Sequence, residues 1–266
     1  MQTKSVRRTA AVTAVSFTAA LMALGGCGRP EDGDGAKNGV PPEPGRTVTA
    51  SGAGAAGRTG RPEPAVPVGD PAALPGVGGR LRAAIPADSR QALVVYGEGQ
   101  DSADATVVLY GLEDGGWRPL GSWSAHNGRN GWTTDHHAGD GRSPVGVFTV
   151  TDAGGVLPDP GARLAYTHDR AAYVPPSYWS PAYQHDFDYV IAIDYNRLRG
   201  APPHDATRPW GAGRGGKIWL HLDHGSGTSA CIGLPREAMR SLLRTFDPAR
   251  DPVVVMGDRV NLMAQR

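Results

Sequence analysis

Three side chains near the C-terminal end of the chain combine nucleophilic and acid–base chemistry. Cys231 follows His221 by ten residues and His224 by seven. A free thiol with a pKa of about 8.5 is mostly protonated at neutral pH, whereas a thiol beside an imidazolium becomes a nucleophilic thiolate. The pattern therefore predicts that Cys231 is a nucleophile, and a loop could fold either His221 or His224 back to the thiol as its general base. His224 is the alternative base, or else a residue of the substrate pocket.

The loop before Cys231 is built from small residues. Gly225, Gly227 and Ala230 leave backbone N–H groups unshielded by side chains. Such a loop can direct amides at the oxyanion that develops when a carbonyl is attacked. Two other interpretations remain open: Cys231 as a small buried hydrophobic residue, or a zinc site formed by both histidines and Cys231. Neither a companion acidic motif for zinc nor a cofactor motif is present, so we expect no cofactor.

The stretch 217–235 resembles the YkuD-type L,D-transpeptidases, cysteine enzymes that remodel bacterial peptidoglycan. His221 matches the histidine at the end of a strand in that family, Thr228 its Ser/Thr and Cys231 its nucleophile. A second segment, Gly139 to Phe148, is similar to the family's Thr-Pro-x-Gly-x-Phe motif, with Ser143 in place of Thr. A third, weaker similarity is the Tyr-Asn pair at residues 195–196. The resemblance covers about residues 92–257.

The chain departs from the common family pattern around the cysteine. Ser229, Ala230 and Gly233 stand where the family has His, Gly and Arg. The sequence is most similar to a divergent branch with Thr-Ala-Gly-Cys at this point. The missing arginine would have contacted an anionic group, so the departure bears on substrate choice.

The resemblance implies that Cys231 attacks the carbonyl before the terminal D-Ala of a stem tetrapeptide, with His221 moving the proton. Amides near Ala230 and Cys231 would hold the oxyanion, and a second stem would resolve the thioester into a 3→3 cross-link. Resolution by water would make the chain an L,D-carboxypeptidase, and an altered loop without turnover would leave a cell-wall-binding lipoprotein. The substrate-binding residues expected from the resemblance are His224, Thr228, Ser229, Ala230, Tyr195 and Asn196. Tyr195 and Asn196 also suit hydrogen bonds that fix the end of a strand.

Short runs rich in Val, Ile, Tyr and Trp, separated by Gly, Asp and Pro, predict strands. They cover residues 92–96, 106–112, 117–123, 145–150, 189–195, 217–222 and 253–256. One helix is expected, because Pro235 suits a first helical position and Met239, Leu242, Leu243 and Phe246 have helical spacing. The predicted fold is therefore mainly β, a YkuD-like sandwich or barrel with one late helix.

The N-terminal sequence predicts the cellular compartment in which the protein acts. Residues 1–26 combine a basic start with a short apolar run, as a secretory signal peptide does. The run ends in Leu-Gly-Gly-Cys, similar to a lipobox, so Cys27 is the expected site of lipidation. Residues 27–80 are rich in Gly and Pro and predict a disordered tether, and residues 81–266 form the predicted catalytic domain. We expect an extracytoplasmic protein, lipid-anchored to the cell membrane and acting in the cell wall. Lipidation of Cys27 would leave Cys231 without a partner in its own chain.

Composition excludes several classes of protein. The chain has 27 basic and 26 acidic residues and a net charge of +1, which provides no basic field for nucleic acid. Its two cysteines are too few for a disulfide-rich scaffold. Peptidoglycan stem peptides and a membrane, reached through the lipid anchor, are the expected partners. Oligomeric state is not predicted.

Three further segments have open interpretations. The polar loop around His136 and His137 either lines a site or is a solvated turn. Arginines at 236, 240 and 244 form a stripe on the predicted helix, expected to be a solvated face or a contact with an anionic polymer. The insert 154–184, rich in Pro, Tyr and Trp, is a candidate cover for the site.

Overall fold

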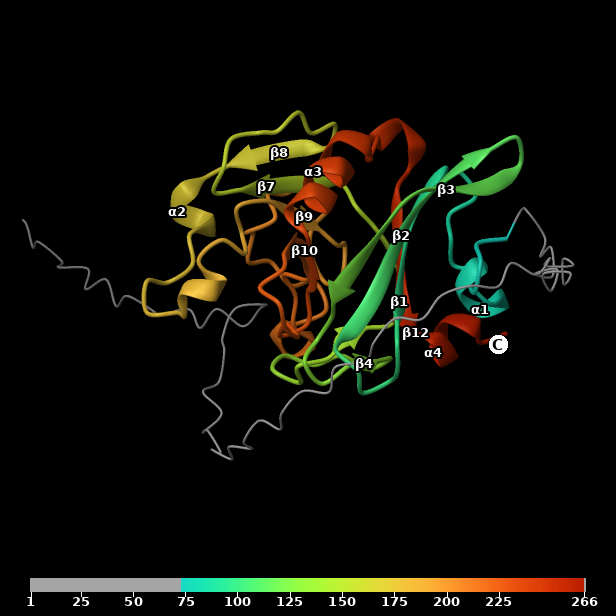
Figure 1. Cartoon of the computed structure of the whole chain (residues 1–266), viewed down its shortest axis with the longest axis horizontal. Coiled ribbons are helices and arrows are strands. Elements are labelled where there is room, and N and C mark those ends of the chain that lie inside the picture. Colours follow the sequence, from blue (N-terminus) through green and yellow to red (C-terminus); the bar gives the residue numbers. More distant parts are fainter. Residues whose placement is uncertain (1–72, 266) are drawn as a thin grey trace, which may run out of the picture.

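The computed structural model describes residues 73–265 (Figure 1). Its strands are β1 Gln91–Gly97, β2 Asp104–Glu113, β3 Gly116–His126, β4 Trp132–Thr133, β5 Ser143–Pro144, β6 Gly146–Thr149, β7 Asp152–Gly155, β8 Ala165–His168, β9 Val190–Ala192, β10 Trp219–Leu222, β11 Ile232–Leu234 and β12 Val253–Asp258. Ten strands form one mixed sheet in the order β6-β12-β1-β2-β3-β11-β10-β9-β7-β8, while β4 and β5 pair separately. The mainly β fold predicted from the sequence is confirmed.

Helices are few and short. They are α1 Gly79–Arg82, α2 Arg170–Tyr173, α3 Arg236–Thr245 and α4 Arg259–Met263, with 3₁₀ turns at Pro181–Tyr183, Ala212–Arg214 and Pro248–Arg250. The predicted late helix is α3, with Pro235 as its N-cap and Phe246 as its C-cap. The helix is therefore one residue shorter at each end than predicted, because Pro235 and Phe246 cap it and are not part of it. The three other helices were not predicted, because each is only four or five residues long and carries too little periodicity.

The central strand β1 is covered on both faces. Ala92, Leu93, Val94 and Val95 are all fully buried, as expected for a strand with no solvated side. Leu93 and Val95 belong to one core cluster, and Ala92 and Val94 to another. Alternation along the strand therefore divides the molecule into two cores, one on each face of the sheet.

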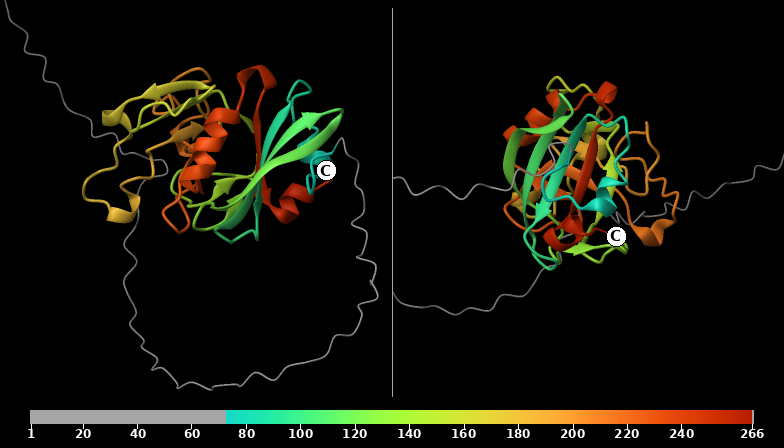
Figure 2. Two further views of the ribbon diagram at one scale, coloured as in Figure 1. Left: turned by 45° about the horizontal axis from the view of Figure 1, so that its top comes forward. Right: turned by 90° about the vertical axis from the view of Figure 1, so that its right-hand side faces the viewer.

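The larger core lies under α3. Its residues come from both ends of the sheet, including Ile191 on β9 and Val254 on β12, and α3 contributes Met239 and Leu242. Figure 2 shows α3 between the two halves of the sheet, against which its apolar side packs. The sheet thus folds around one shared core, and α3 holds the two halves together.

The smaller core is covered by the ends of the described chain. Leu81 of α1 and Leu262 of α4 pack on the outer face of β1 and β12. Leu74 and Val77 join them, a few residues ahead of the domain boundary predicted at Leu81. The predicted signal peptide, the lipidation site and most of the predicted tether lie outside the described residues.

Two predicted strands are shorter than expected where they approach the functional residues. The run 189–195 is a strand only over β9, and Asn196, with a positive φ of 44°, turns the chain after this run. The run 217–222 begins its strand at Trp219, since Lys217 has a φ of 55°. Asn tolerates this left-handed conformation better than Lys does. Strand β11, directly after Cys231, was not predicted, since three residues carry no periodicity.

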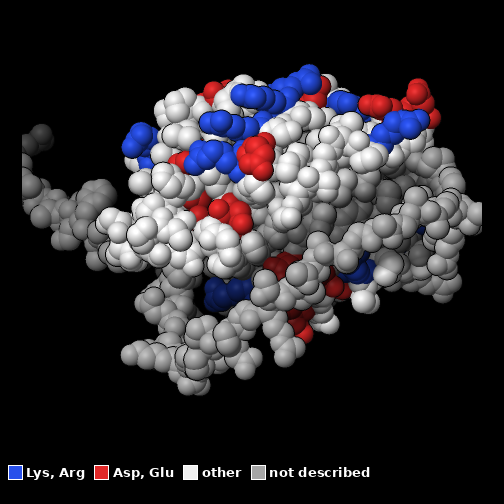
Figure 3. Space-filling view, in the orientation of Figure 1, with Lys and Arg blue, Asp and Glu red and all other residues white. Residues whose placement is uncertain are grey.

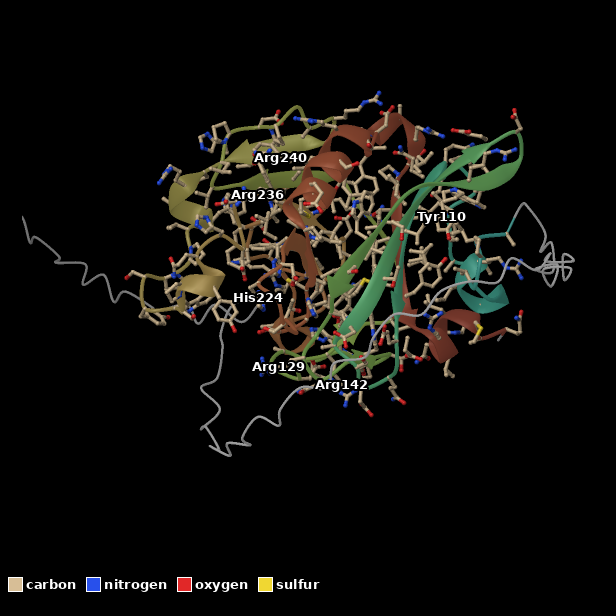
Figure 4. All side chains as sticks on the ribbon, in the orientation of Figure 1. Tyr110, Arg129, Arg142, His224, Arg236 and Arg240 are labelled. Carbon is tan, nitrogen blue, oxygen red and sulfur yellow. The ribbon has the colours of Figure 1, made fainter. Side chains whose placement is uncertain are left out.

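The arginine stripe of α3 lies on the surface, and each of its members has a partner. Arg236 pairs with Asp188 at 2.6 Å, and Arg240 lies 5.7 Å from the centre of the Tyr189 ring. The Nε of Arg244 donates to the Pro160 carbonyl. Figure 3 shows basic side chains along the upper rim, where Figure 4 labels Arg236 and Arg240 in the same orientation. Acidic side chains are interspersed among them, as on an ordinary solvated face.

Candidate active site

Cys231 and His221 lie on neighbouring parallel strands. The register of β10 and β11 sets Leu220 beside Ile232 and His221 beside Gly233. One step back along this register, Cys231 comes beside Trp219, and the Trp219 N–H donates to its Sγ at 3.2 Å. Side chains two residues apart on a strand share a face. The pairing therefore brings the thiol position and the imidazole to the same face of the sheet.

The sulfur of Cys231 is deeply buried. The residue is 0% exposed and belongs to a cluster with Trp219, Phe187 and Tyr173. Its Sγ lies 3.5 Å from the Lys217 carbonyl oxygen, to which a thiol can donate. In this structure Cys231 is disulfide-bonded, whereas the sequence predicted an unpartnered thiol if Cys27 is lipidated.

The loop before Cys231 is anchored by two buried hydroxyls. Thr228 donates to the Cys231 carbonyl at 2.7 Å. Ser143 donates to the Ala230 carbonyl at 2.7 Å and accepts from the Gly128 N–H at 2.9 Å. The second motif of the sequence therefore meets the first through Ser143. The sequence did not predict that Ser143 anchors the cysteine loop, although its position in the Ser-Pro-Val-Gly motif was the available signal.

A loop after β3 holds the other side of the cysteine loop. The Thr228 N–H donates to the Asn127 carbonyl, and the Arg129 N–H donates to the Thr228 carbonyl. The Arg129 guanidinium lies at 3.5 Å from the Ser229 hydroxyl, on the surface. Figure 4 labels Arg129 on this loop. Of the three loop residues expected to bind substrate, Thr228 and Ala230 are thus buried and structural, while Ser229 is partly exposed.

His221 is a buried histidine with a defined tautomer. Its Nδ1 lies 2.7 Å from the Leu222 carbonyl oxygen, and the residue is 1% exposed. A carbonyl oxygen only accepts, so Nδ1 carries the proton and Nε2 has a lone pair. Nε2 makes no hydrogen bond among the described residues. Burial lowers the pKa of His221 below its ordinary value, which keeps the ring neutral at neutral pH.

His224 has the opposite electrostatic environment. Its Nδ1 lies 2.9 Å from a carboxylate oxygen of Asp186, and both side chains are 4% exposed. Burial acts to lower the pKa of His224, but the hydrogen bond and charge of Asp186 outweigh it and raise the pKa. The rings of His221 and His224 are nearly parallel, with centroids 6.2 Å apart. Two imidazoles therefore lie side by side, of which His221 favours the neutral form and His224 the protonated form.

Asp186 was not predicted as a site residue. It stands 38 residues before His224 in the chain, with no motif that links the two. Its backbone carbonyl accepts from the Leu222 N–H, which places the carboxylate beside β10. Only the folded chain brings this acid to the histidines.

Aromatic rings from the predicted insert 154–184, and from Phe187 shortly after it, lie around the site. Phe187 lies 5.5 Å from the ring of His221 and 5.3 Å from that of Trp219. Tyr183 lies 4.4 Å from the ring of His224, which Figure 4 labels. Tyr173 packs against Trp219 at 6.0 Å. The insert expected to cover the site does lie against it.

Three buried polar atoms of this aromatic wall have no hydrogen-bond partner within residues 73–265. They are the hydroxyl of Tyr173 and the indole nitrogens of Trp179 and Trp219. Buried donors normally find partners. Together with Nε2 of His221, they give the surroundings of Cys231 an unsatisfied polar character suited to a polar substrate.

Tyr195 and Asn196 do not contact Cys231 through any described hydrogen bond. Asn196 is buried, and its amide donates to the Gly211 and Gly215 carbonyls and accepts from the Trp210 N–H. The Tyr195 hydroxyl donates to the His136 carbonyl at 3.3 Å. Asn196 therefore fixes the loop that leads into β10, which is the structural role the sequence allowed.

Residues 73–265 contain neither a cluster of metal ligands nor a membrane-spanning helix. No three His, Cys, Asp or Glu side chains within them are grouped so that they could hold a metal ion. The zinc alternative thus finds no ligand set in this part of the chain. Within the same residues, no helix has the length and apolar character needed to cross a bilayer.

Comparisons with known proteins give a family. No curated protein matches the chain significantly. The structure of Bdellovibrio bacteriovorus Bd1075 aligns with a TM-score of 0.35 and 13% identity, over 70% of this chain and 52% of that one. The chain thus spans about half the length of that protein. The family model for the YkuD L,D-transpeptidase catalytic domain matches residues 90–255. Because this match covers more than half of the chain, the protein belongs to the YkuD L,D-transpeptidase family.

Proposed function

We propose that the reduced form of this protein is a peptidoglycan L,D-transpeptidase, with Cys231 as nucleophile and His221 as general base. The observation that carries the proposal is the buried His221 imidazole, whose Nδ1–H is held by Leu222 while Nε2 keeps its lone pair. A neutral imidazole with a free lone pair is what a thiol needs as a base. Membership of the YkuD family supports the reaction class and the peptidoglycan substrate.

His221 is a better base than His224. The Asp186 carboxylate raises the pKa of His224 and favours its imidazolium form, which cannot take a proton. Burial acts the other way on His221 and favours the form that can. We assign His224 with Asp186 to the substrate side of the site, where an imidazolium donates hydrogen bonds.

The proposed reaction has two acyl-transfer steps. His221 takes the thiol proton, and the thiolate attacks the carbonyl that precedes the terminal D-Ala of a stem tetrapeptide. The C–N bond breaks, a thioester forms, and D-Ala leaves with the proton from His221. The side-chain amine of a diamino acid from a second stem then attacks the thioester, which forms the 3→3 amide and restores the thiol.

Backbone amides of the cysteine loop would stabilise the oxyanion in both steps. The loop is suited to this role because Thr228 and Ser143 fix the carbonyls of Cys231 and Ala230. Fixed carbonyls also fix the peptide planes that carry the neighbouring N–H groups.

The proposed location is the extracytoplasmic side of the cell membrane, with a lipid on Cys27. The basic start, the short apolar run and the Leu-Gly-Gly-Cys ending of residues 1–27 support this location. The reaction needs the thiol form of Cys231, so its disulfide must be reduced before catalysis. Mass spectrometry of the protein from its native membrane would detect an acylated Cys27, and an unmodified residue would refute the anchor.

The activity is tested with the full chain under reducing conditions and a disaccharide-tetrapeptide substrate, followed by mass spectrometry. The expected result is loss of D-Ala with formation of a 3→3 dimer, abolished by Cys231→Ala. His221→Ala should lower kcat by at least about a hundredfold. His185→Ala is the matched control, since its side chain is 75% exposed.

Each alternative outcome has a definite meaning. Release of D-Ala without dimers would replace the transpeptidase with an L,D-carboxypeptidase that uses the same residues. Unchanged tetrapeptide, with the reduced thiol verified by mass, would overturn the enzyme proposal in favour of a cell-wall-binding lipoprotein. Activity that survives Cys231→Ala would refute the assigned nucleophile.

A further inference from the structure

A concave feature of the surface is formed by residues that the proposed mechanism does not use. A pocket of about 400 Å³ opens between the polar loop around His136 and the loop around Trp210. Its size falls in the range of small-molecule sites in proteins. None of the proposed catalytic residues lines it. The polar loop that the sequence left unexplained is therefore one wall of a pocket.

The pocket has an aromatic corner centred on Tyr195. The rings of Phe148, Trp210 and His136 all pack edge-to-face on Tyr195, with centroid distances of 5.8, 5.4 and 5.3 Å. Edge-to-face contacts of this kind hold rings in a fixed geometry. Trp210 is nevertheless 59% exposed. A rigidly held but exposed indole at the mouth of a pocket is available to a ligand.

The basic side chains of the pocket wall lie next to acidic side chains. Arg214 forms an ion pair with Asp135. His136 lies 3.0 Å from Asp140, and burial lowers the pKa of its imidazole, so the ring is neutral at neutral pH. No cation of the wall is left without a neighbouring carboxylate. The pocket is therefore poorly suited to an anion and well suited to a neutral ligand with many hydroxyl or amide groups.

The pocket is joined to the active site by two short segments. Pro144, on its wall, follows Ser143, which holds the Ala230 carbonyl next to Cys231. Tyr195 precedes Asn196, which holds Gly215 two residues before Lys217, and the Lys217 carbonyl lies 3.5 Å from Sγ. The pocket wall is thus connected through two hydrogen-bonded segments to the residues that contact Cys231.

We infer that this pocket binds an N-acetylated amino-sugar ring of the glycan strand whose stem peptide enters the active site. A pyranose ring has an apolar face that can cover the exposed Trp210 indole. Its hydroxyl and amide groups can bond with Thr134 and with the Arg214–Asp135 pair. The inference rests on the proposed function for its physiological substrate, but sugar binding itself is independent of catalysis.

The direct test is calorimetric titration of the full-length protein with N,N′-diacetylchitobiose. We expect saturable binding that Trp210→Ala weakens by about tenfold, the cost of one lost aromatic contact. Tyr178→Ala is the matched control, because Tyr178 is an 83% exposed aromatic residue that does not line the pocket. Absence of saturable binding, or equal binding by the Trp210 variant, would overturn the inference.

A kinetic test separates this inference from the proposed function. The ratio of kcat/KM for disaccharide-tetrapeptide to that for free tetrapeptide should fall at least about fivefold in Trp210→Ala. An unchanged ratio would refute a role for the pocket in the reaction. If the wild-type protein turns over neither substrate, the proposed function fails, and the chitobiose titration still decides whether the pocket binds sugar.

Discussion

Two stacked histidines show how local surroundings divide chemical roles between identical side chains. His221 is enclosed by the protein and bonded to a carbonyl, so its neutral form is favoured. His224 is bonded to the buried carboxylate of Asp186, so its charged form is favoured. The assignment of base and hydrogen-bond donor follows from these neighbours and not from the residue type.

The raised pKa of His224 predicts a pH-dependent contribution to stability. The folded-state pKa exceeds that of the unfolded chain, so the stabilisation is complete below the unfolded pKa of about 6.5. It is lost as the pH rises through the folded-state pKa. The advantage in Tm of wild type over His224→Gln should therefore shrink between pH 6 and pH 9. A change of about 2–4 °C would correspond to about 1 kcal/mol in a domain of this size.

Thermal unfolding followed by circular dichroism at several pH values measures this difference. Asp186→Asn provides the comparison, because it removes the carboxylate that raises the pKa and should abolish most of the pH dependence. An advantage that grows with pH would show that His224 is neutral in the folded protein.

At the scale of elements, the cysteine loop depends on segments that are distant in sequence. Ser143 of β5 joins the loop after β3 to the loop before β11 through two buried hydrogen bonds. Strand β11 is only three residues long, so its own pairing with β10 cannot fix Cys231 by itself. The hydroxyl of Ser143 supplies the missing constraint.

Removal of that hydroxyl should be costly. Ser143→Ala leaves the Gly128 N–H and the Ala230 carbonyl without a partner in a buried place, with an expected loss of about 1–3 kcal/mol in the free energy of unfolding. It should also lower kcat more than it raises KM, because the loop positions the nucleophile. Denaturant unfolding and steady-state kinetics measure the two effects.

Ser143→Thr keeps the hydroxyl and places there the residue that the family motif carries. It should retain most of the stability and most of the kcat. Equal behaviour of the Ala and Thr variants would mean that the hydroxyl does not position the loop.

For the molecule as a whole, the two faces of the central sheet have separate cores. Leu262 lies in the outer core with α1 and α4, whereas Leu220 lies in the core under α3 and on the same strand as His221. Both leucines are fully buried. Substitutions in the two cores should therefore affect stability alike and activity differently.

Leu262→Ala and Leu220→Ala should each lower the free energy of unfolding by about 2–5 kcal/mol, as buried leucines do when a cavity forms. Under conditions where both remain folded, Leu262→Ala should keep wild-type kcat, because its core does not touch β10. Leu220→Ala should lower kcat, since it disturbs the strand that carries His221. Denaturation curves and initial rates on the same samples make the comparison, and equal loss of kcat in both variants would argue against separate cores.

The sequence by itself determined the class of fold, the strong strands, the late helix and the cysteine–histidine motif. These features depend on local periodicity or on short motifs, which a chain carries wherever it folds. Residues 92–96 and 253–256 are predicted as strands because both runs are apolar and rich in valine. The family resemblance likewise rested on the local motifs around Cys231 and Ser143.

Only the tertiary structure decided how the site is completed. Asp186 reaches His224 from 38 residues away, Phe187 places its ring 5.5 Å from that of His221, and Asn196 holds a loop by hydrogen bonds. The hydrogen bond that leaves Nε2 of His221 with its lone pair also exists only in the folded strand. Such contacts join segments whose spacing in the sequence carries no signal, because the path of the chain through the whole sheet sets which residues meet.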